Sequence, residues 1–241
     1  VYWRGGDQAR ESIWHASDRT SFTECKAMGE AAPNALNEAA CSSDDMSAFD
    51  FYSCFPSAIE MACKQLGIDE NDPRDFTVTG GLPYAGGPGN NFAMHSIAAM
   101  TQRLRNRLNS NDHTGLVTGN GWYMTEHAAA VLSVNPPATA YDPSIHNGKA
   151  HPSILATNIL DEAAATQPVD GKQSVIETYT VIYNRDGSPE RGVILGKTNR
   201  GKRFVANTPN DRSLLEAFVK SEQVGKLGSV SSSSGMNVFE P

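Results

Sequence analysis

The sequence lacks long apolar runs, an excess of basic residues and a dense set of cysteines. Its longest apolar runs are far shorter than the roughly 20 residues that span a bilayer, and no charged-then-apolar leader precedes the first predicted strand. The net charge of −7 opposes non-specific binding to nucleic acid, which usually requires a basic excess. We therefore expect neither a membrane nor a nucleic acid among the partners.

Cysteine is scarce, and its spacing carries little information. The four cysteines show no paired metal-ligand spacing and no disulfide framework: Cys25, Cys41, Cys54 and Cys63. Three of them lie in helix-like stretches, where a free cysteine behaves as a small hydrophobic residue. We expect no metal site and a reducing, cytoplasmic compartment.

Periodicity predicts an α/β fold for the first part of the chain. Hydrophobic residues make up 39% and charged residues 20% of the 241 residues, as in a globular protein with room for a large domain and a smaller companion. Strands are predicted over 1–3, 48–52, 76–79 and 115–118, and helices over 22–40, 55–66, 92–108 and 125–133. This alternation over residues 1–135 is typical of a mainly parallel or mixed sheet with flanking helices, whose functional loops follow the carboxyl ends of the strands.

The composition shifts at Asn135-Pro136-Pro137, and the second part of the chain has β patterns. Residues 136–172 are expected to form a connector with a helix near 154–165. Residues 173–241 are predicted to form a small antiparallel barrel, because short strand patterns alternate with turn signals such as Asp186-Gly187. The expected elements are strands over 175–183, 192–198 and 203–207, a helix over 213–220, and a mobile or loosely turned tail near 231–235.

Three loops, at residues 51–58, 79–91 and 117–123, each follow a strand-like run and precede a helix-like run. Because the carboxyl ends of parallel strands meet at one sheet edge, we expect these loops to open onto one shared cavity. None of them offers a complete nucleophile–base pair. The chain therefore has the features of part of an active site.

The loop from Gly80 to Asn91 contains five glycines. Glycine lets the backbone approach a ligand closely, and the amino terminus of the following helix favours negative charge, so an oxyanion or a phosphate suits this place. The spacing does not match a P-loop, and a tight strand-to-helix turn explains the glycines equally well. The candidate ligand-binding residues of this loop and of the third loop are Gly80, Gly81, Gly86, Gly87, Pro88, Asn90, Asn91, Gly121 and Tyr123.

Four side chains are candidates for catalysis, each with a structural alternative. Cys54 lies at a predicted helix start, where the helix dipole lowers a thiol pKa, but it is equally explained as a packed side chain. Tyr52 places a hydroxyl at a strand end or serves as a core aromatic residue. His95 lies one turn into a helix and faces either the cavity or solvent. Asn120 donates to a carbonyl or simply occupies a turn, and His127 is expected on a helix face.

At these residues the sequence resembles the carboxyl-terminal half of the thiolase superfamily, over about residues 1–135. The nearest branch is the bacterial thiolase-like proteins often labelled acetyl-CoA acetyltransferase, and the β-rich tail resembles their extra, OB-like carboxyl-terminal domain. Tyr52-Ser53-Cys54-Phe55 stands where thiolases have His-Asp-Cys-Phe, and Gly86-Gly87-Pro88 stands where they have Gly-His-Pro. The histidine of the second motif is glycine here, and no thiol lies near Val117 or Thr118, where the Cys-x-Gly motif falls.

The resemblance implies an acyl-CoA acyltransferase that makes or breaks carbon–carbon bonds on coenzyme A thioesters. These thioesters are substrates, and no other cofactor is implied. The nucleophilic cysteine of thiolases belongs to their amino-terminal half, so this chain is expected to be a fragment or one subunit of a split enzyme, inactive alone. The implied partners are an acyl-CoA, an amino-terminal half and a second copy in a homo-oligomer. The alternatives are a non-catalytic acyl-CoA-binding or scaffold module, and a nucleophilic role for Cys54 itself.

Overall fold

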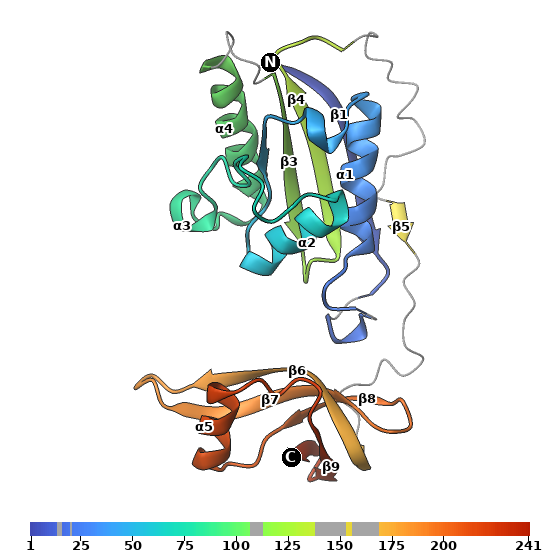
Figure 1. Ribbon diagram of the computed structural model, residues 1–241, viewed down its shortest axis with the longest axis vertical. Helices are drawn as coiled ribbons and strands as arrows, with labels where there is room; N and C mark the ends of the chain where they lie inside the picture. Colours follow the sequence, from blue (N-terminus) through green and yellow to red (C-terminus); the bar gives the residue numbers. More distant parts are fainter. Residues whose placement is uncertain (14–15, 20, 107–112, 138–152, 156–168) are drawn as a thin grey trace. The chain divides into compact units, whose positions relative to one another are not determined.

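A computed structural model describes residues 1–13, 16–19, 21–106, 113–137, 153–155 and 169–241. The chain divides into two compact units, Val1–Asn158 and Ile159–Pro241 (Figure 1). The predicted connector, 136–172, falls largely outside the described residues. Of its expected helix, the first residues belong to a short strand, β5 (Ser153–Leu155), and the rest lie outside the described residues.

The first unit is built on a five-stranded mixed sheet in the order β2-β3-β4-β1-β5. Its long strands are β1 (Tyr2–Glu11), β3 (Thr114–Gly121) and β4 (Glu126–Ser133), and β2 (Ala48–Asp50) is short. β2 pairs with β3, and β1 with β5, in parallel; β4 pairs with both β3 and β1 in antiparallel fashion. The α/β class and a mixed sheet are thus confirmed, with antiparallel rather than parallel pairing at the centre of the sheet.

The correction lies in β4, which was predicted as a helix over 125–133. Its run of alanines favours a helix by intrinsic propensity. In the fold, however, Ala129 and Val131 pack on one face of the sheet, and Ala130 and Leu132 on the other. Because both faces of a central strand are covered, its sequence is apolar throughout and loses the period of two that identifies a strand.

In the part of the chain that the structure describes, the helices beside this sheet are α1 (Lys26–Glu38), α2 (Pro56–Leu66), α3 (Leu82–Ala85) and α4 (Phe92–Asn106), with short 3-10 turns at Ala16–Asp18, Ser43–Asp45 and Gly89–Asn91. α2 confirms its prediction, because Pro56 opens it and Gly67, in the left-handed region, ends it. α1 starts later than predicted and continues through Pro33. The predicted strand at 76–79 makes a single bridge, from Thr77 to Asp50.

The helices cover both faces of the sheet (Figure 1). On one face, α1 and α2 bury a core that includes Phe49, Phe51, Leu116 and Val131. On the other, Met100 and Leu104 of α4 pack with Ala48, Val117, Ala130 and Leu132. The β3–β4 hairpin projects at the end of the sheet where β2 leads into α2, so residues from several loops are brought to one edge.

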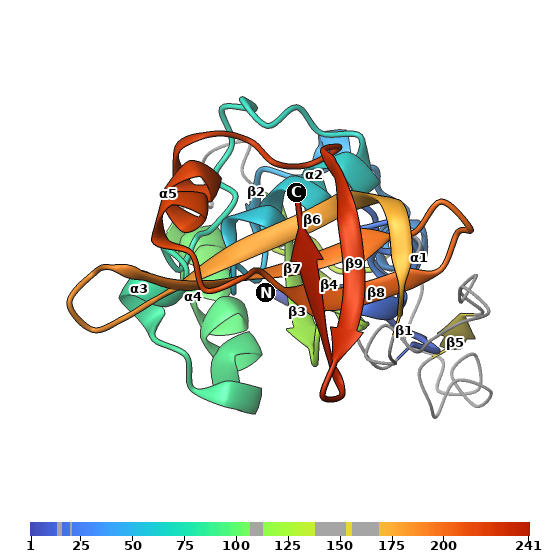
Figure 2. The ribbon, with the colours of Figure 1, turned by 90° about the horizontal axis from the view of Figure 1, so that it is seen from below.

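The second unit is a closed five-stranded barrel in the order β10-β8-β7-β6-β9 (Figure 2). Its elements are β6 (Gly171–Tyr183), β7 (Pro189–Lys197), β8 (Arg203–Asn207), α5 (Arg212–Lys220), β9 (Leu227–Ser233) and β10 (Met236–Glu240). The predicted small barrel is confirmed, and it is mixed rather than antiparallel throughout, because β10 pairs with β8 in parallel. Of the expected mobile or loosely turned tail, residues 234–235 do form a turn, but residues 231–233 belong to β9. β9 and β10 form the hairpin that closes the barrel around Val230 and Phe239.

Two findings bear on the expectations about compartment and membrane. All four cysteines are free. Within the described ranges, no helix combines the length and apolar character needed to cross a membrane.

Candidate active site

A cavity of about 650 Å³ lies at the edge of the sheet where the hairpin projects. It is bounded by β1, the loop after β2, the residues that open α4, and both arms of the β3–β4 hairpin. Its lining residues are Gln8, Ala9, Tyr52, Cys54, Phe55, Gly89, Asn90, Phe92, Ala93, Gly119, Asn120, Gly121, Trp122, Tyr123, Met124, Glu126, His127 and Ala128.

Parts of all three predicted loops therefore lie around this cavity. Of the candidate residues, those that line it are Tyr52, Cys54, Asn90, Asn120, Gly121 and Tyr123. Those that do not line it are Gly80, Gly81, Gly86, Gly87, Pro88, Asn91 and His95. His95 is exposed on α4. The roles expected for these residues remain predictions, but their positions divide them into two groups.

The first glycines of the Gly80–Asn91 loop have a structural explanation. Both Gly80 and Gly81 have positive φ angles, of 79° and 73°. A Cβ on Gly81 would lie 2.5 Å from the Ser53 hydroxyl oxygen, and one on Gly80 would lie 2.7 Å from the ring of Tyr84. Glycine is therefore required there by the turn and by close packing, without reference to a ligand.

The outer rim of the cavity is aromatic and exposed. Phe55, Trp122 and Tyr123 expose 64%, 65% and 56% of their surfaces. In the hairpin turn, Trp122 and Met124 have positive φ angles of 52° and 60°, which non-glycine residues rarely adopt. Each such residue costs on the order of 1–3 kcal/mol and persists only where the surroundings hold it in place.

Tyr52 forms one wall of the cavity. Its ring meets the ring of Phe92 edge-on with 4.7 Å between the centroids, and its backbone N–H donates to the Thr118 hydroxyl at 3.0 Å. Burial, with a smaller contribution from Cys54, raises the pKa of the Tyr52 hydroxyl. The phenol therefore stays protonated at neutral pH and is a hydrogen-bond donor rather than a base.

Beneath the hairpin lies a buried imidazole. His127, 5% exposed, has its Nδ1 2.7 Å from Asn120 Oδ1 and its Nε2 3.0 Å from Cys25 Sγ and 2.9 Å from the Met124 carbonyl oxygen. Burial lowers the pKa of His127 to about 4. Burial, followed by the charge of Glu11, raises the pKa of Cys25 to about 11. Both groups are thus neutral at neutral pH.

A buried ion pair supports the same turn. Arg19 lies 3.2 Å from Glu11, and both side chains are almost fully buried. The guanidinium also donates to the Met124 carbonyl and, at 3.1 Å, to the Glu24 carbonyl. Glu11 accepts from the backbone N–H of Lys26 at 2.8 Å, so its charge lies at the amino terminus of α1, where the helix dipole favours it. The pair thereby connects β1, α1 and the hairpin turn.

Neither Cys25 nor His127 was identified as a site residue from the sequence. His127 was predicted on a helix face because β4 was taken for a helix, and Cys25 was treated as a small hydrophobic residue. The Asn120-Gly121 dipeptide, a hairpin signal when it forms the turn, lies at the end of β3 instead, and the turn follows it at residues 122–125. The contact between Cys25 and His127 joins residues 102 positions apart, and nothing in the local sequence indicates it.

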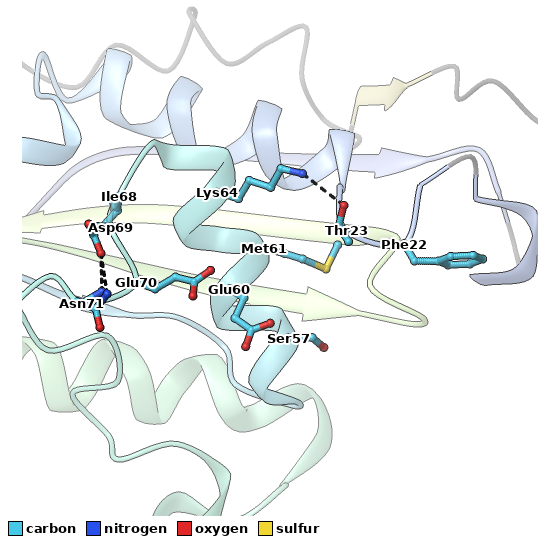
Figure 3. Close-up of a pocket in the computed structure, with 10 residues that line it drawn as sticks. All are labelled: Phe22, Thr23, Ser57, Glu60, Met61, Lys64, Ile68, Asp69, Glu70 and Asn71. Carbon is cyan, nitrogen blue, oxygen red and sulfur yellow. Dashed lines mark hydrogen bonds between the residues drawn. The ribbon is translucent and has the colours of Figure 1, made fainter. Parts of the chain in front are cut away.

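Figure 3 shows a second hollow, of about 540 Å³, beside α2. Its polar lining includes the carboxylates of Glu60, Asp69 and Glu70, and the amine of Lys64, which donates to the Thr23 hydroxyl. Its lining residues include no histidine or cysteine. Phe22 is its aromatic lining residue, whereas the cavity at the hairpin is lined by five aromatic side chains, those of Tyr52, Phe55, Phe92, Trp122 and Tyr123.

The comparisons with known proteins agree with this architecture. Residues 157–234 match the family model of the thiolase-like protein type 1 additional C-terminal domain. The chain is also similar to the crystal structure of a monomeric SCP2-thiolase like protein type 1 from Mycobacterium smegmatis, with 30% sequence identity and a TM-score of 0.76 over 99% of this chain. The chain matches the carboxyl-terminal part of thiolase-like proteins of type 1. The family expected from the sequence is confirmed, as is its fold, a mixed α/β thiolase-like half domain with an additional barrel.

This thiolase-like chain spans half the length of its Mycobacterium smegmatis relative. The peroxisomal 3-ketoacyl-CoA thiolase of Saccharomyces cerevisiae matches with 18% identity and a TM-score of 0.39, over 54% of this chain and 33% of that one. Human mitochondrial 3-ketoacyl-CoA thiolase matches with 18% identity and a TM-score of 0.39, over 55% of this chain and 30% of that one. No curated protein matches the thiolase-like chain in sequence.

Proposed function

We propose that the cavity at the β3–β4 hairpin binds the acyl-thioester part of an acyl-CoA, as part of a thiolase-like acyl-CoA acyltransferase. The observation that carries this proposal is the combination of neutral polar groups inside the cavity with aromatic side chains at its rim. Asn120 and Tyr52 suit a thioester carbonyl, while Phe55, Trp122 and Tyr123 suit an acyl chain.

Each group has a defined task in this proposal. The amide of Asn120 donates to the thioester oxygen, on which negative charge develops when a nucleophile attacks the carbonyl carbon. The aromatic rim holds the acyl chain and excludes water. Cys54, half-buried at the cavity wall, lies within the same space. The nucleophile and the acid–base group that thiolase chemistry requires are proposed to come from an amino-terminal half or a partner subunit.

The second candidate function is a non-catalytic acyl-CoA-binding or scaffold module. One observation favours this module. Among the described residues, the histidine that lines the cavity is His127, which is buried and neutral, and His95 lies outside the cavity. Both candidates predict that this chain alone does not cleave acetoacetyl-CoA, and robust cleavage would contradict that expectation. Cleavage after an amino-terminal thiolase half is added would favour catalysis, whereas acyl-CoA affinity without cleavage in that mixture would favour the module.

The resemblance to thiolases led us to expect a homo-oligomer, and this expectation stays a prediction. The Mycobacterium smegmatis relative is monomeric. We take this as support for a single copy rather than an oligomer in the proposed function.

Isothermal titration with octanoyl-CoA tests the proposed site. We expect Trp122→Ala to weaken octanoyl-CoA binding about tenfold, a loss of ~1.4 kcal/mol, because an aromatic wall of the acyl site is removed. The same substitution should weaken the binding of acetyl-CoA much less, because its acyl group is short and makes less contact with the aromatic rim.

Trp3→Ala is the matched control, since Trp3 is also an exposed tryptophan of the first unit, 55% exposed, and does not line the cavity. Equal losses in the two variants, or no binding of either acyl-CoA to the unsubstituted chain, would contradict the proposal.

A further inference from the structure

The hydrogen bonds around Asn120 determine which end of its amide faces which neighbour. One amide atom lies 3.2 Å from the Tyr52 carbonyl oxygen, and the other lies 2.7 Å from His127 Nδ1. The atom beside the carbonyl must be Nδ2, because an oxygen there would oppose a second oxygen with no hydrogen between them. Asn120 Oδ1 is therefore the atom that faces His127.

This orientation fixes the tautomer of His127. Since Asn120 Oδ1 can only accept, His127 Nδ1 must carry the hydrogen. The neutral imidazole then has a lone pair at Nε2, and Cys25 Sγ, 3.0 Å away, supplies an S–H donor for it. The Met124 carbonyl accepts from the Arg19 guanidinium, and it lies farther from Cys25 Sγ, at 3.3 Å, than Nε2 does, so the thiol hydrogen is directed to Nε2.

The result is a directed chain of hydrogen bonds, from the Cys25 thiol to His127, from His127 to Asn120, and from Asn120 to the Tyr52 carbonyl. The Asn120 amide nitrogen has two hydrogens, and only one is used by Tyr52. Because Asn120 lines the cavity and is only half-buried, the second hydrogen is available to a ligand there.

We propose that Cys25 and His127 are positioning residues that lock Asn120 with its N–H donor, rather than its oxygen, toward the cavity, and so select a ligand that presents a carbonyl oxygen or an oxyanion. This inference rests on the proposed function and narrows it, since a thioester carries such an oxygen and a thioether does not. Without the thiol donor, His127 is free to move its hydrogen to Nε2 and donate to the Met124 carbonyl. Asn120 then turns its oxygen toward the ligand.

The first test reads the tautomer directly in the full 241-residue chain. With ¹⁵N-labelled histidine, NMR at neutral pH should show His127 protonated at Nδ1 and not at Nε2. We expect Cys25→Ala to shift the hydrogen to Nε2, while Cys25→Ser, which keeps a donor, preserves Nδ1–H. Cys63→Ala is the matched control, because Cys63 is equally buried in the same core but lies away from His127. His127 protonated at Nε2 in the unsubstituted chain would overturn the inference.

The second test compares acetyl-CoA with S-ethyl-CoA, a thioether of the same length without the carbonyl. The unsubstituted chain should bind acetyl-CoA about threefold to tenfold more tightly, as one net hydrogen bond provides. The preference should disappear in Asn120→Asp and Cys25→Ala and persist in Cys25→Ser and Cys63→Ala.

The outcomes separate the two proposals. Equal affinity for the two ligands in the unsubstituted chain, or a preference that survives Cys25→Ala, would overturn the inference and leave the proposed function standing. No binding of either ligand would overturn both.

Discussion

Replacement of Arg19 by methionine (Arg19→Met) will lower the free energy of unfolding of the first unit by about 3–5 kcal/mol. The variant leaves the carboxylate of Glu11 buried without its ion-pair partner, since both side chains are almost fully buried. It also removes the guanidinium that donates to the carbonyls of Glu24 and Met124. The strained turn of the β3–β4 hairpin would lose the group that fixes Met124.

The measurement is urea unfolding followed by tryptophan fluorescence. All three tryptophans, Trp3, Trp14 and Trp122, belong to the first unit, so their signal reports that unit and not the barrel. Arg10→Met is the control, because Arg10 pairs with Glu126 at 3.4 Å on the exposed surface of the same unit, where a pair contributes about 0–1 kcal/mol. If Arg19→Met costs no more than Arg10→Met, the buried pair does not support the site as described.

The second large effect is a loss of stability in acid caused by His127. In the unfolded chain His127 takes up a proton near pH 6.5, whereas in the folded protein burial delays uptake until about pH 4. Between these values the unfolded state holds more protons, so the free energy of unfolding falls as the pH falls. The stabilisation is complete above pH 6.5 and is lost as the pH drops through 4; a shift of this size corresponds to about 3 kcal/mol.

His127→Gln should remove the contribution of His127 to the pH dependence of the free energy of unfolding and leave the contribution of the carboxylates unchanged. We therefore expect the stability of the unsubstituted chain to fall more steeply than that of His127→Gln between pH 6.5 and 4, again by tryptophan fluorescence. His95→Gln, at an exposed position on α4, should keep the steep profile. Parallel profiles for the unsubstituted chain and His127→Gln would show that His127 is not buried as a neutral group.

Much of the fold could be predicted because its signals are local. α2 is bounded by Pro56 and Gly67, and β8 over Arg203–Asn207 was predicted with its observed ends. β4 could not be recognised, since its alanines face two covered sides of the sheet and carry no strand period. The same holds for β9 and β10, where a serine-rich stretch becomes strands because barrel closure pairs Val230 with Phe239, a contact that composition does not reveal.

The residues that line the cavity were predictable only where they lie at or near the ends of strands. Tyr52, Cys54, Asn120 and Tyr123 follow β2 or belong to the β3–β4 hairpin, and the loops there meet at one edge of the sheet. The glycine-rich loop was the most conspicuous motif, yet Gly80 and Gly81 are explained by packing. The Cys25–His127–Asn120 chain depends on the tertiary fold and has no counterpart in any local pattern.

The central claim is that the cavity at the β3–β4 hairpin is the acyl-thioester site. Photo-crosslinking with an octanoyl-CoA carrying a diazirine on its acyl chain, followed by peptide mass spectrometry, tests it most directly. We predict label on peptides containing Phe55, Trp122 and Tyr123, competed away by unmodified octanoyl-CoA. Label concentrated on the residues of the second hollow, such as Met61 and Ile68, would contradict the claim.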